Sequence, residues 1–509
     1  MNTYLIANGG CGERLASVML MLYQCGFYGT ADPIKGVLVI DNDRKNHSLI
    51  HLRNIVEAVN NMNEALGRDD IPPIEAVAWA PEIISGESLH YLLSSVSEYE
   101  AVCLISTADE MQQRINEKGY AGHANIGAVY INTIFEEDRN SNSRRFCDFL
   151  SEACPKQSEE EARFIIMGST HGGTGASLNT AIAKKIRSYY KESTAKIDIF
   201  GLFMQSYYTI PPMGKHAVDN NIHIDPEQFR PSDIEALETY RDMHLIDEEN
   251  PVFDNILFCG FSPRPPINLE HQEGGDPQEN RFSIPELIMC AGANCIFEGN
   301  TVRNQYLAID LGNFDGTIRW RNIPYGMELK KCIEGMGLFA CSITEENKDA
   351  AWNNLLRKRV GNFINYFYYI TPVHMTDEFP LFLASRNRVL FFVELFWNML
   401  YQITTNVNGS WNENVALLKK DAFEEKPRPQ GFDWIDDVMS DATIVNNDGE
   451  TFTGENVPSM FSFCNVFKRV SIRNKIGFIR TYSDVYVRVE AYFKALLDAS
   501  YATYEEVEN

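Results

Sequence analysis

Apolar and polar positions over the first 300 residues follow a pattern that predicts buried strands separated by helices. Short, nearly continuous apolar runs recur, and the stretches between them carry apolar residues three and four positions apart. Such runs are typical of parallel strands covered on both faces, and the three-and-four spacing is typical of helices with one buried face. The predicted strands are 4–8, 36–40, 101–106, 163–167, 197–204 and 255–261. This pattern predicts an α/β fold with a doubly wound parallel sheet.

The pattern changes near residue 283, and this divides the chain into three parts. A strongly apolar stretch at 284–297 predicts a buried helix. Beyond it the regular alternation ends, and strand-like pieces at 306–311 and 337–343 mix with apolar helices such as 389–404. We therefore expect a nucleotide-type domain at 1–282, a central core helix at 283–300 and an α+β C-terminal region at 301–509.

Composition limits the classes of partner. The 509 residues include 45 Lys and Arg against 70 Asp and Glu, a formal charge of −25. A nucleic-acid-binding protein needs a basic stripe, so direct nucleic-acid binding is disfavoured, whereas a local pocket for one small polyanion is still allowed.

The cysteines and the apolar runs indicate the compartment. The 11 cysteines include no C-x-x-C pair and no zinc-like spacing, which favours reduced thiols and no metal site. The N-terminal residues lack the basic and apolar segments of a signal peptide. The longest apolar run, 389–401, is interrupted by Glu394 and Asn398 and is too short to cross a bilayer. We expect a cytoplasmic chain without membrane insertion.

The most informative segment is a glycine-rich stretch between the predicted strand at 163–167 and a predicted helix at 180–190. It reads Gly168-Ser169-Thr170-His171-Gly172-Gly173-Thr174-Gly175-Ala176-Ser177. Glycines let main-chain N–H groups approach phosphate oxygens, and a following helix N-terminus adds unpaired N–H donors. The loop lacks the Lys of a Walker A motif, so it is not an ordinary P-loop. His171 in this loop fits three interpretations: a proton donor, a phosphate contact or a residue without chemistry.

Two further glycine segments follow predicted strands. Gly9-Gly10-Cys11-Gly12 follows the first strand, and 119–127, which contains Ala124 and Asn125, follows the third. Carboxyl ends of parallel strands meet at one edge of a sheet, where such folds bind ligands. Asp41 ends the second strand and either contacts a ribose or a metal-bound water, or faces solvent.

Together these segments resemble the tubulin/FtsZ superfamily, and most closely its divergent prokaryotic tubulin-like members. The family signature is Gly-Gly-Gly-Thr-Gly-Ser/Thr-Gly, and this chain keeps Gly172-Gly173-Thr174-Gly175, with His171 and Ser177 replacing the outer glycines. The segment 119–127 is similar to the FtsZ stretch Gly-Ala-Gly-Ala-Asn-Pro. The resemblance covers about residues 1–300.

The resemblance implies a guanine nucleotide, GTP or GDP, with Mg²⁺ as a possible companion ion. Its phosphates would lie against two groups of residues, and the base would lie against the core helix. The implied contacts are Gly10, Cys11, Gly12, Ala124, Asn125, Gly172, Gly173, Thr174 and Gly175 for the phosphates, and Asn294 and Phe297 for the base.

The acidic loop that the family uses for hydrolysis across a subunit interface is not recognisable after the core helix. The nearest acids are Glu298 and Asp310. A carboxylate must reach the attacking water, so either an unrecognised acid supplies it or hydrolysis is slow or absent.

Three functions are compatible with these observations. The first is a GTPase that self-assembles into filaments or a switchable scaffold, with other copies of the chain as partners. The alternative is a non-polymerising GTP- or GDP-binding regulatory or sensor subunit of a multi-protein bacterial system, such as phage defence or plasmid segregation, with partners from the same operon. The third, a dinucleotide-dependent oxidoreductase, is disfavoured because Glu13 and Arg14 follow Gly12, so the first loop lacks the last glycine of the dinucleotide fingerprint.

Overall fold

The computed structural model describes most of the predicted sheet and several helices of the remainder. The described residues are 1–29, 32–43, 45–68, 71, 73–79, 127–128, 141–209, 229–246, 249–260, 267–268, 280–299, 303–310, 317–343, 378–406, 409–418, 444–445, 451–452, 490 and 493–502. The chain divides into two compact units. Unit 1 comprises Met1–Leu20, Tyr28–Val56 and Ile74–Asn313, and unit 2 comprises Met21–Phe27, Glu57–Pro73 and Phe314–Asn509.

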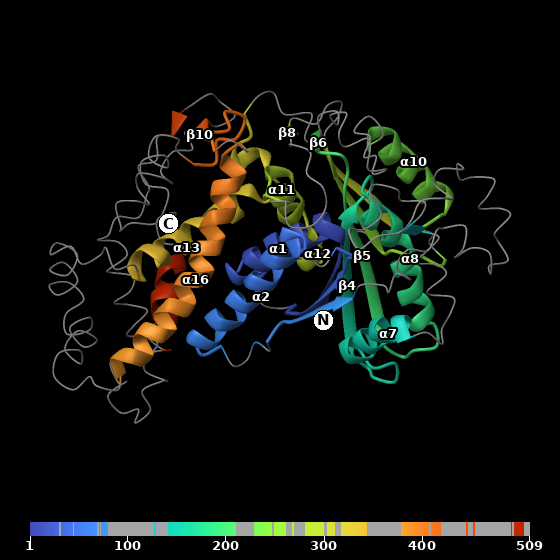
Figure 1. Ribbon diagram of the computed structural model, residues 1–509, viewed down its shortest axis with the longest axis horizontal. Helices are drawn as coiled ribbons and strands as arrows, with labels where there is room; N and C mark the ends of the chain where they lie inside the picture. Colours follow the sequence, from blue (N-terminus) through green and yellow to red (C-terminus); the bar gives the residue numbers. More distant parts are fainter. Residues whose placement is uncertain are drawn as a thin grey trace. The chain divides into compact units, whose positions relative to one another are not determined.

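Unit 1 is built on a seven-stranded parallel sheet, which confirms the predicted α/β fold (Figure 1). The strands are β1 Asn2–Asn8, β2 Ile34–Ile40, β3 Glu75–Trp79, β4 Glu161–Ser169, β5 Lys196–Met204, β7 Asn255–Gly260 and β9 Gln305–Asp310. Their order is β3-β2-β1-β4-β5-β7-β9. The predicted strand at 101–106 lies outside the described residues, and β3 was not predicted.

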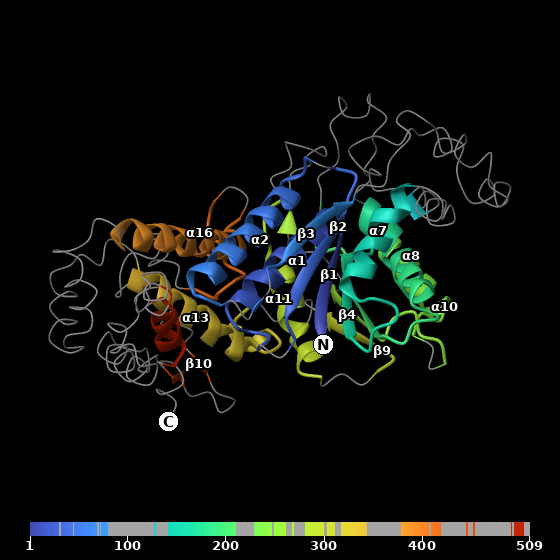
Figure 2. The same cartoon turned by 90° about the horizontal axis from the view of Figure 1, so that it is seen from below.

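Helices cover both faces of this sheet. They are α1 Gly9–Gln24, α2 His47–Ala65, α7 Ser141–Ala153, α8 Gly173–Tyr189, α10 Phe229–Asp242, α11 Ile284–Gly292 and α12 Asn294–Phe297. Figure 2 shows α7, α8 and α10 on one face and α1 and α11 on the other. Alternate strand residues such as Ile6, Phe164 and Phe203 pack under α7, α8 and α10 in one buried cluster. The sheet is therefore buried on both faces, as the continuous apolar runs indicate.

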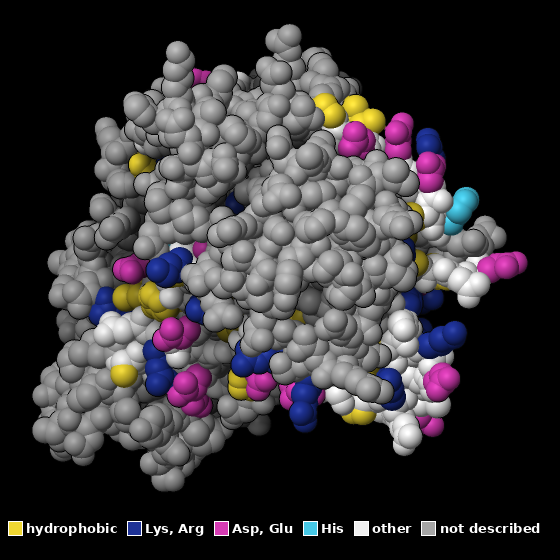
Figure 3. All heavy atoms as spheres, turned by 45° about the vertical axis from the view of Figure 1, so that its right-hand side comes forward, with side chains coloured by type: hydrophobic (Ala, Val, Ile, Leu, Met, Phe, Trp, Pro, Cys, Tyr) yellow, Lys and Arg dark blue, Asp and Glu magenta, His cyan; other side chains and the backbone are white. Residues whose placement is uncertain are grey.

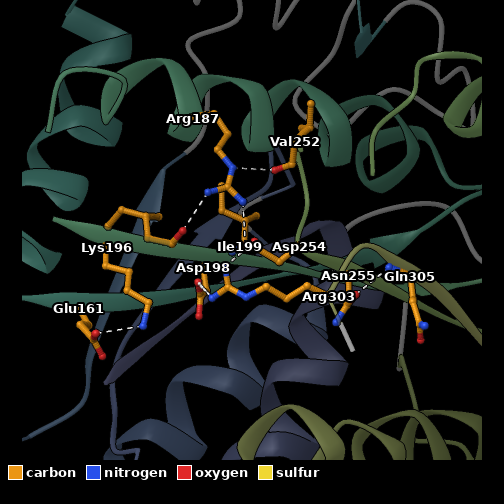
Figure 4. Close-up of polar contacts among 11 residues, drawn as sticks. Glu161, Arg187, Lys196, Asp198, Ile199, Val252, Asp254, Asn255, Arg303 and Gln305 are labelled. Atoms are coloured by element: carbon orange, nitrogen blue, oxygen red, sulfur yellow. Dashed lines mark hydrogen bonds and ion pairs between the residues drawn. The ribbon is translucent and has the colours of Figure 1, made fainter. Parts of the chain in front are cut away.

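Ion pairs join the strands at the amino edge of the sheet (Figure 4). Arg187 of α8 donates to Asp254, just before β7, at 2.7 Å and to the carbonyl oxygen of Ile197 at 2.8 Å. Arg303, just before β9, donates to Asp198 of β5 at 2.9 Å. These contacts fix the amino ends of β5, β7 and β9, because Asp198 and Asp254 are buried and need partners.

The predicted core helix is present, but its connection differs from our expectation. It forms α11 and α12, and the chain then returns as β9, which pairs with β7 in parallel. The helix thus crosses between two strands of one sheet, and unit 1 extends to Asn313. The strand-like piece predicted at 306–311 is confirmed as β9, but its pattern did not indicate that it joins this sheet, because an edge strand is only half covered and four of its six residues are exposed.

Unit 2 consists mainly of helices in its described part. It contains α13 Gly326–Ile343, α16 Glu378–Thr404 and the short hairpin β10 Ile444–Val445 with β11 Thr451–Phe452. The predicted helix at 389–404 is confirmed within α16. The predicted strand at 337–343 is wrong, because these residues continue α13, whose buried residues Ile333, Met336 and Ala340 recur at helical spacing. None of the helices in the described ranges is long and apolar enough to cross a membrane.

Packing at the start of α1 gives a direct test of the fold. A Cβ at Gly12 would lie 2.5 Å from the carbonyl oxygen of Met167, whereas a Cβ at Gly10 would be no closer than 3.5 Å to its nearest neighbour. We expect Gly12→Ala to destabilise unit 1 by about 1–3 kcal/mol, seen as a lower thermal midpoint.

Gly10→Ala is the matched control, because it lies in the same helix turn and gains the same helix propensity. Its midpoint should stay close to that of the wild type. Equal midpoints for the two variants would contradict the packing that the structure shows at Gly12.

Candidate functional site

The two described glycine segments lie side by side where the strand order reverses. β1 and β4 are adjacent and parallel, β2 and β3 lie beyond β1, and β5, β7 and β9 lie beyond β4. Asn8 ends β1 and Gly9 begins α1, whereas Ser169 ends β4 and Gly173 begins α8. A Cβ at Gly9 would lie 3.0 Å from the Cβ of Thr174, so the two turns touch. Reversal points of this kind are where open parallel sheets bind ligands.

Some glycines of these segments are required for packing. Gly12 lies against Met167, and a Cβ at Gly175 would lie 2.8 Å from the main-chain nitrogen of Ser169. These two positions, which we assigned to phosphate contact, bring α1 and α8 close to the strand ends. Helix starts packed this closely aim their unpaired N–H groups at the same edge of the sheet.

Two other glycines of these segments face side chains and not backbone atoms, and a Cβ at Gly172 would lie 2.7 Å from Ser169 Oγ. The nearest neighbour of a Cβ at Gly10 would be Ser48 Oγ at 3.5 Å, followed by Arg14 Nη1 at 3.7 Å. Gly172 is the N-cap of α8, and its N–H donates to Ser169 Oγ at 3.1 Å. We call the residues at these two helix starts the cradle: Gly10 on one side, and Gly172, Gly173 and Thr174 on the other.

Two buried asparagines link the strand ends. Asn8 Nδ2 donates to Asn179 Oδ1 at 3.1 Å, and Asn179 Nδ2 donates to the carbonyl oxygen of Ser169 at 3.1 Å. Both side chains are fully buried. They tie β1, β4 and α8 together beneath the cradle, and sequence reasoning missed them because neither lies in a glycine segment.

Asp233 of α10 anchors the loop after β4. Its carboxylate accepts hydrogen bonds from Thr170 Oγ1, from Ser206 Oγ and, at 2.7 Å, from the main-chain N–H of Ser206. His171 Nδ1 lies 3.3 Å from Asp233 Oδ1. Burial by itself raises the pKa of Asp233, but the contacts from His171, Ser206 and Thr170 outweigh it and hold that pKa below its usual value. His171 is buried and pairs with a carboxylate through one ring nitrogen.

Arg14 connects the first turn to α11. Its Nε donates to Glu286 Oε1 at 2.5 Å, and its Nη2 donates to Tyr207 Oη at 2.6 Å. Tyr207 Oη in turn donates to Glu286 Oε1 at 2.7 Å. Glu286 Oε2 accepts the main-chain N–H of Ser283 at 2.8 Å, which caps α11. Arg14 is thus a buried cation that is held firmly beside Gly10.

Cys11 lies next to this cluster. Burial raises the pKa of the Cys11 thiol to about 12, so it is a neutral thiol at neutral pH. In the described part of the chain, no group of three or more His, Cys, Asp or Glu side chains is arranged to hold a metal ion.

Two buried carboxyl groups lie near the carboxyl ends of β1 and β2: Glu13 in α1, and Asp41 directly after β2. Asp41 accepts the main-chain N–H of Asp43 and the Nδ2 of Asn46, each at 3.0 Å. Burial raises the pKa of Asp41 to about 7. Glu13 is fully buried, and neither of its oxygens forms a hydrogen bond of normal geometry although Asn46 lies beside it. Burial, with the charge of Asp41 added, raises the pKa of Glu13 well above its usual value. Asp41 therefore does not face solvent.

Ala124 and Asn125 lie outside the described residues, and the structure does not bring Asn294 and Phe297 to this edge. The ring of Phe297 stacks on Tyr28 with centroids 4.4 Å apart and lies 5.4 Å from the guanidinium of Arg163. Arg163 lies six residues before the end of β4, about 20 Å along the strand. Asn294 is in the same short helix. The residues of this crossover helix that reach the cradle side are Ser283 and Glu286.

The two weak catalytic candidates also lie apart from the cradle. Glu298 is exposed and accepts a hydrogen bond from Asn294 Nδ2 at 3.2 Å, at the end of α12. Asp310 ends β9, three strands from β4 and about 14 Å away at ordinary strand spacing.

No protein-family model matches this chain, and no curated protein matches it. Any proposal of a function therefore rests on the contacts of the residues in and around the cradle.

The buried carboxyl pair predicts a dependence of stability on pH. Both folded pKa values are raised, so the stability that the neutral forms contribute is complete at low pH and is lost as the pH rises through about 7 for Asp41. We expect Glu13→Gln, which cannot ionise, to raise stability at pH 8 by about 1–3 kcal/mol and by much less at pH 5.

Thermal unfolding at the two pH values measures this difference. Glu152→Gln, at an exposed position of α7, is the control and should change neither midpoint. A Glu13→Gln variant that is less stable than the wild type at pH 8 would show that Glu13 is ionised and partnered.

Proposed function

We propose that this chain binds a guanine nucleotide, GTP or GDP, with its phosphates between the starts of α1 and α8. The observation that carries the proposal is the contact of the two glycine turns, Gly9 against Thr174, at the ends of adjacent strands β1 and β4. Each turn runs directly into a helix. Two helix N-termini that converge on one cradle supply unpaired N–H donors and two positive dipole ends, the features that bind phosphate groups.

The residues that border the cradle fit a polyanion. Gly10, Gly172, Gly173 and Thr174 would hold phosphate oxygens through main-chain N–H groups and the Thr174 hydroxyl, and Arg14 adds a buried positive charge. The net charge of −25 does not conflict with this ligand, because the binding groups are mostly main-chain amides. On the face in Figure 3, described basic and acidic side chains are interspersed.

The choice of guanine, and the assembly of the chain, follow from the resemblance to the tubulin/FtsZ superfamily. In that family, GTP hydrolysis needs acidic residues from a second subunit. A GTPase of this kind would therefore hydrolyse GTP when copies of the chain associate into filaments or a scaffold. A non-polymerising nucleotide-binding subunit is the second candidate. It is favoured by the positions of Glu298 and Asp310, neither of which lies at the cradle.

Nucleotide binding is tested with the full chain and a fluorescent GDP analogue. Gly10→Ala should weaken binding at least about tenfold, or 1.4 kcal/mol, because a methyl group would occupy the approach to the Gly10 N–H. The thermal midpoint of this variant should stay close to that of the wild type. Unchanged affinity in Gly10→Ala would place the ligand elsewhere.

Chromatography of the nucleotide extracted from the purified chain tests the base. A guanine nucleotide supports the proposal, and NAD would favour the oxidoreductase. Light scattering with GTP and Mg²⁺ separates the two guanine-nucleotide functions: a rise indicates assembly, and a chain that stays monomeric with bound nucleotide indicates the regulatory subunit.

A further inference from the structure

Arg14 and the start of α2 lie beside Gly10, and three nitrogen-bearing side chains belong to these two helix segments. They are Arg14 of α1 and His47 and His51 of the first two turns of α2. Arg14 Nη1 donates to Ser48 Oγ at 3.3 Å, which places the start of α2 against α1. The rings of His47 and His51 lie 6.4 Å apart. This start of α2 was not among the residues that the sequence predicted for the site.

The same cluster borders the space in front of Gly10. Ser48 Oγ and Arg14 Nη1 are the two atoms nearest to the position that a Gly10 Cβ would take, at 3.5 and 3.7 Å. Asn46 Oδ1 accepts the main-chain N–H of Leu49 at 2.8 Å and so caps α2. The start of α2 therefore turns the Ser48 hydroxyl and the positive end of its dipole toward that space, and α1 adds a guanidinium N–H of Arg14.

The Nη1 atom of Arg14 forms a longer hydrogen bond than its Nε and Nη2 atoms do. Nε and Nη2 form hydrogen bonds of 2.5 and 2.6 Å with Glu286 and Tyr207, while the bond from Nη1 to Ser48 is longer. A guanidinium has five N–H donors in a fixed fork, so Nη1 can bind an oxygen at Gly10 without releasing Glu286.

His51 is the group in this cluster whose charge can change. It is partly buried and packs on Phe282, which precedes α11, with ring centroids 5.9 Å apart. The charged groups that act on it are His47 on its own helix and Arg14 on α1. Burial first, and then these two neighbours, lower the pKa of His51. The imidazole is therefore neutral near pH 7 when no anion is bound.

We propose that Arg14, Ser48 and His51 form a side-chain phosphate subsite beside Gly10, and that a phosphate group bound there is accompanied by uptake of a proton on His51. The inference rests on the proposed function, because the phosphate belongs to the nucleotide. A phosphate brings negative charge close to an imidazole whose pKa is lowered by burial and by its neighbours His47 and Arg14, and it shifts the balance toward the imidazolium. Linkage then makes binding tighter as the pH falls, since the bound state holds more protons.

Calorimetry of the full chain with GDP, and separately with inorganic pyrophosphate, measures this uptake. Titrations at pH 7.5 in buffers with different ionisation enthalpies give the number of protons from the dependence of the binding enthalpy on the buffer. We expect an uptake between about half and one proton per site, and an affinity that falls severalfold between pH 6.5 and 8.

His51→Gln should abolish the uptake and flatten the pH dependence. His244→Gln, at an exposed position after α10, is the matched control and should keep both. If His51→Gln folds poorly, the imidazole resonance of His51 in the wild-type chain replaces it: its titration midpoint should rise by about one pH unit or more with GDP.

The outcomes distinguish a failure of the phosphate subsite from a failure of the proposed function. If neither GDP nor pyrophosphate binds to the wild-type chain, the proposed function fails. If GDP binds without proton uptake, or if the uptake persists in His51→Gln, the subsite is overturned while the proposed function stands.

Discussion

The close approach of α1 to the carboxyl ends of β1 and β4 is the constraint on which the candidate site depends. A side chain at position 12 would meet the carbonyl oxygen of Met167 at 2.5 Å, so α1 can lie there only with glycine. This approach lets α1 begin directly after Asn8 and brings Gly9 against Thr174. The cradle between α1 and α8 is thus a consequence of how the helices pack on the sheet.

Both edges of the sheet contain buried polar groups. At the amino edge, Arg187, Arg303, Asp198 and Asp254 satisfy one another in ion pairs. Buried side-chain atoms of Thr3, Arg163 and Asn255 near this edge nevertheless form no hydrogen bond of normal geometry with the described residues, and near the carboxyl edge the same is true of both carboxyl oxygens of Glu13. Buried polar groups without partners cost free energy, and native proteins retain them mainly at functional sites. Unpaired buried atoms therefore do not distinguish the two edges, and the choice of the carboxyl edge rests on the glycine turns that lie there.

The sequence was sufficient for the sheet and the glycine turns because both signals are local. Continuous apolar runs gave β1, β2, β4, β5 and β7, and four glycines in eight residues gave the turn before α8. The partners of these turns were not predictable, because they come from distant parts of the chain. Asp233 is 63 residues from Thr170, and Glu286 is 272 residues from Arg14. The position of Phe297 away from the cradle was not predictable for a related reason: periodicity shows that a helix is buried but not which end of it lies at a given edge of the sheet.

Hydrogen–deuterium exchange of the full chain with and without GTP tests the central claim most directly, since it reports on the main-chain N–H groups that would hold the phosphates. A nucleotide in the cradle predicts slower exchange in peptides that cover 9–14 and 170–177, together with 46–51 at the start of α2. Unchanged exchange in all three segments, with protection elsewhere in the chain, would contradict a phosphate site between α1 and α8.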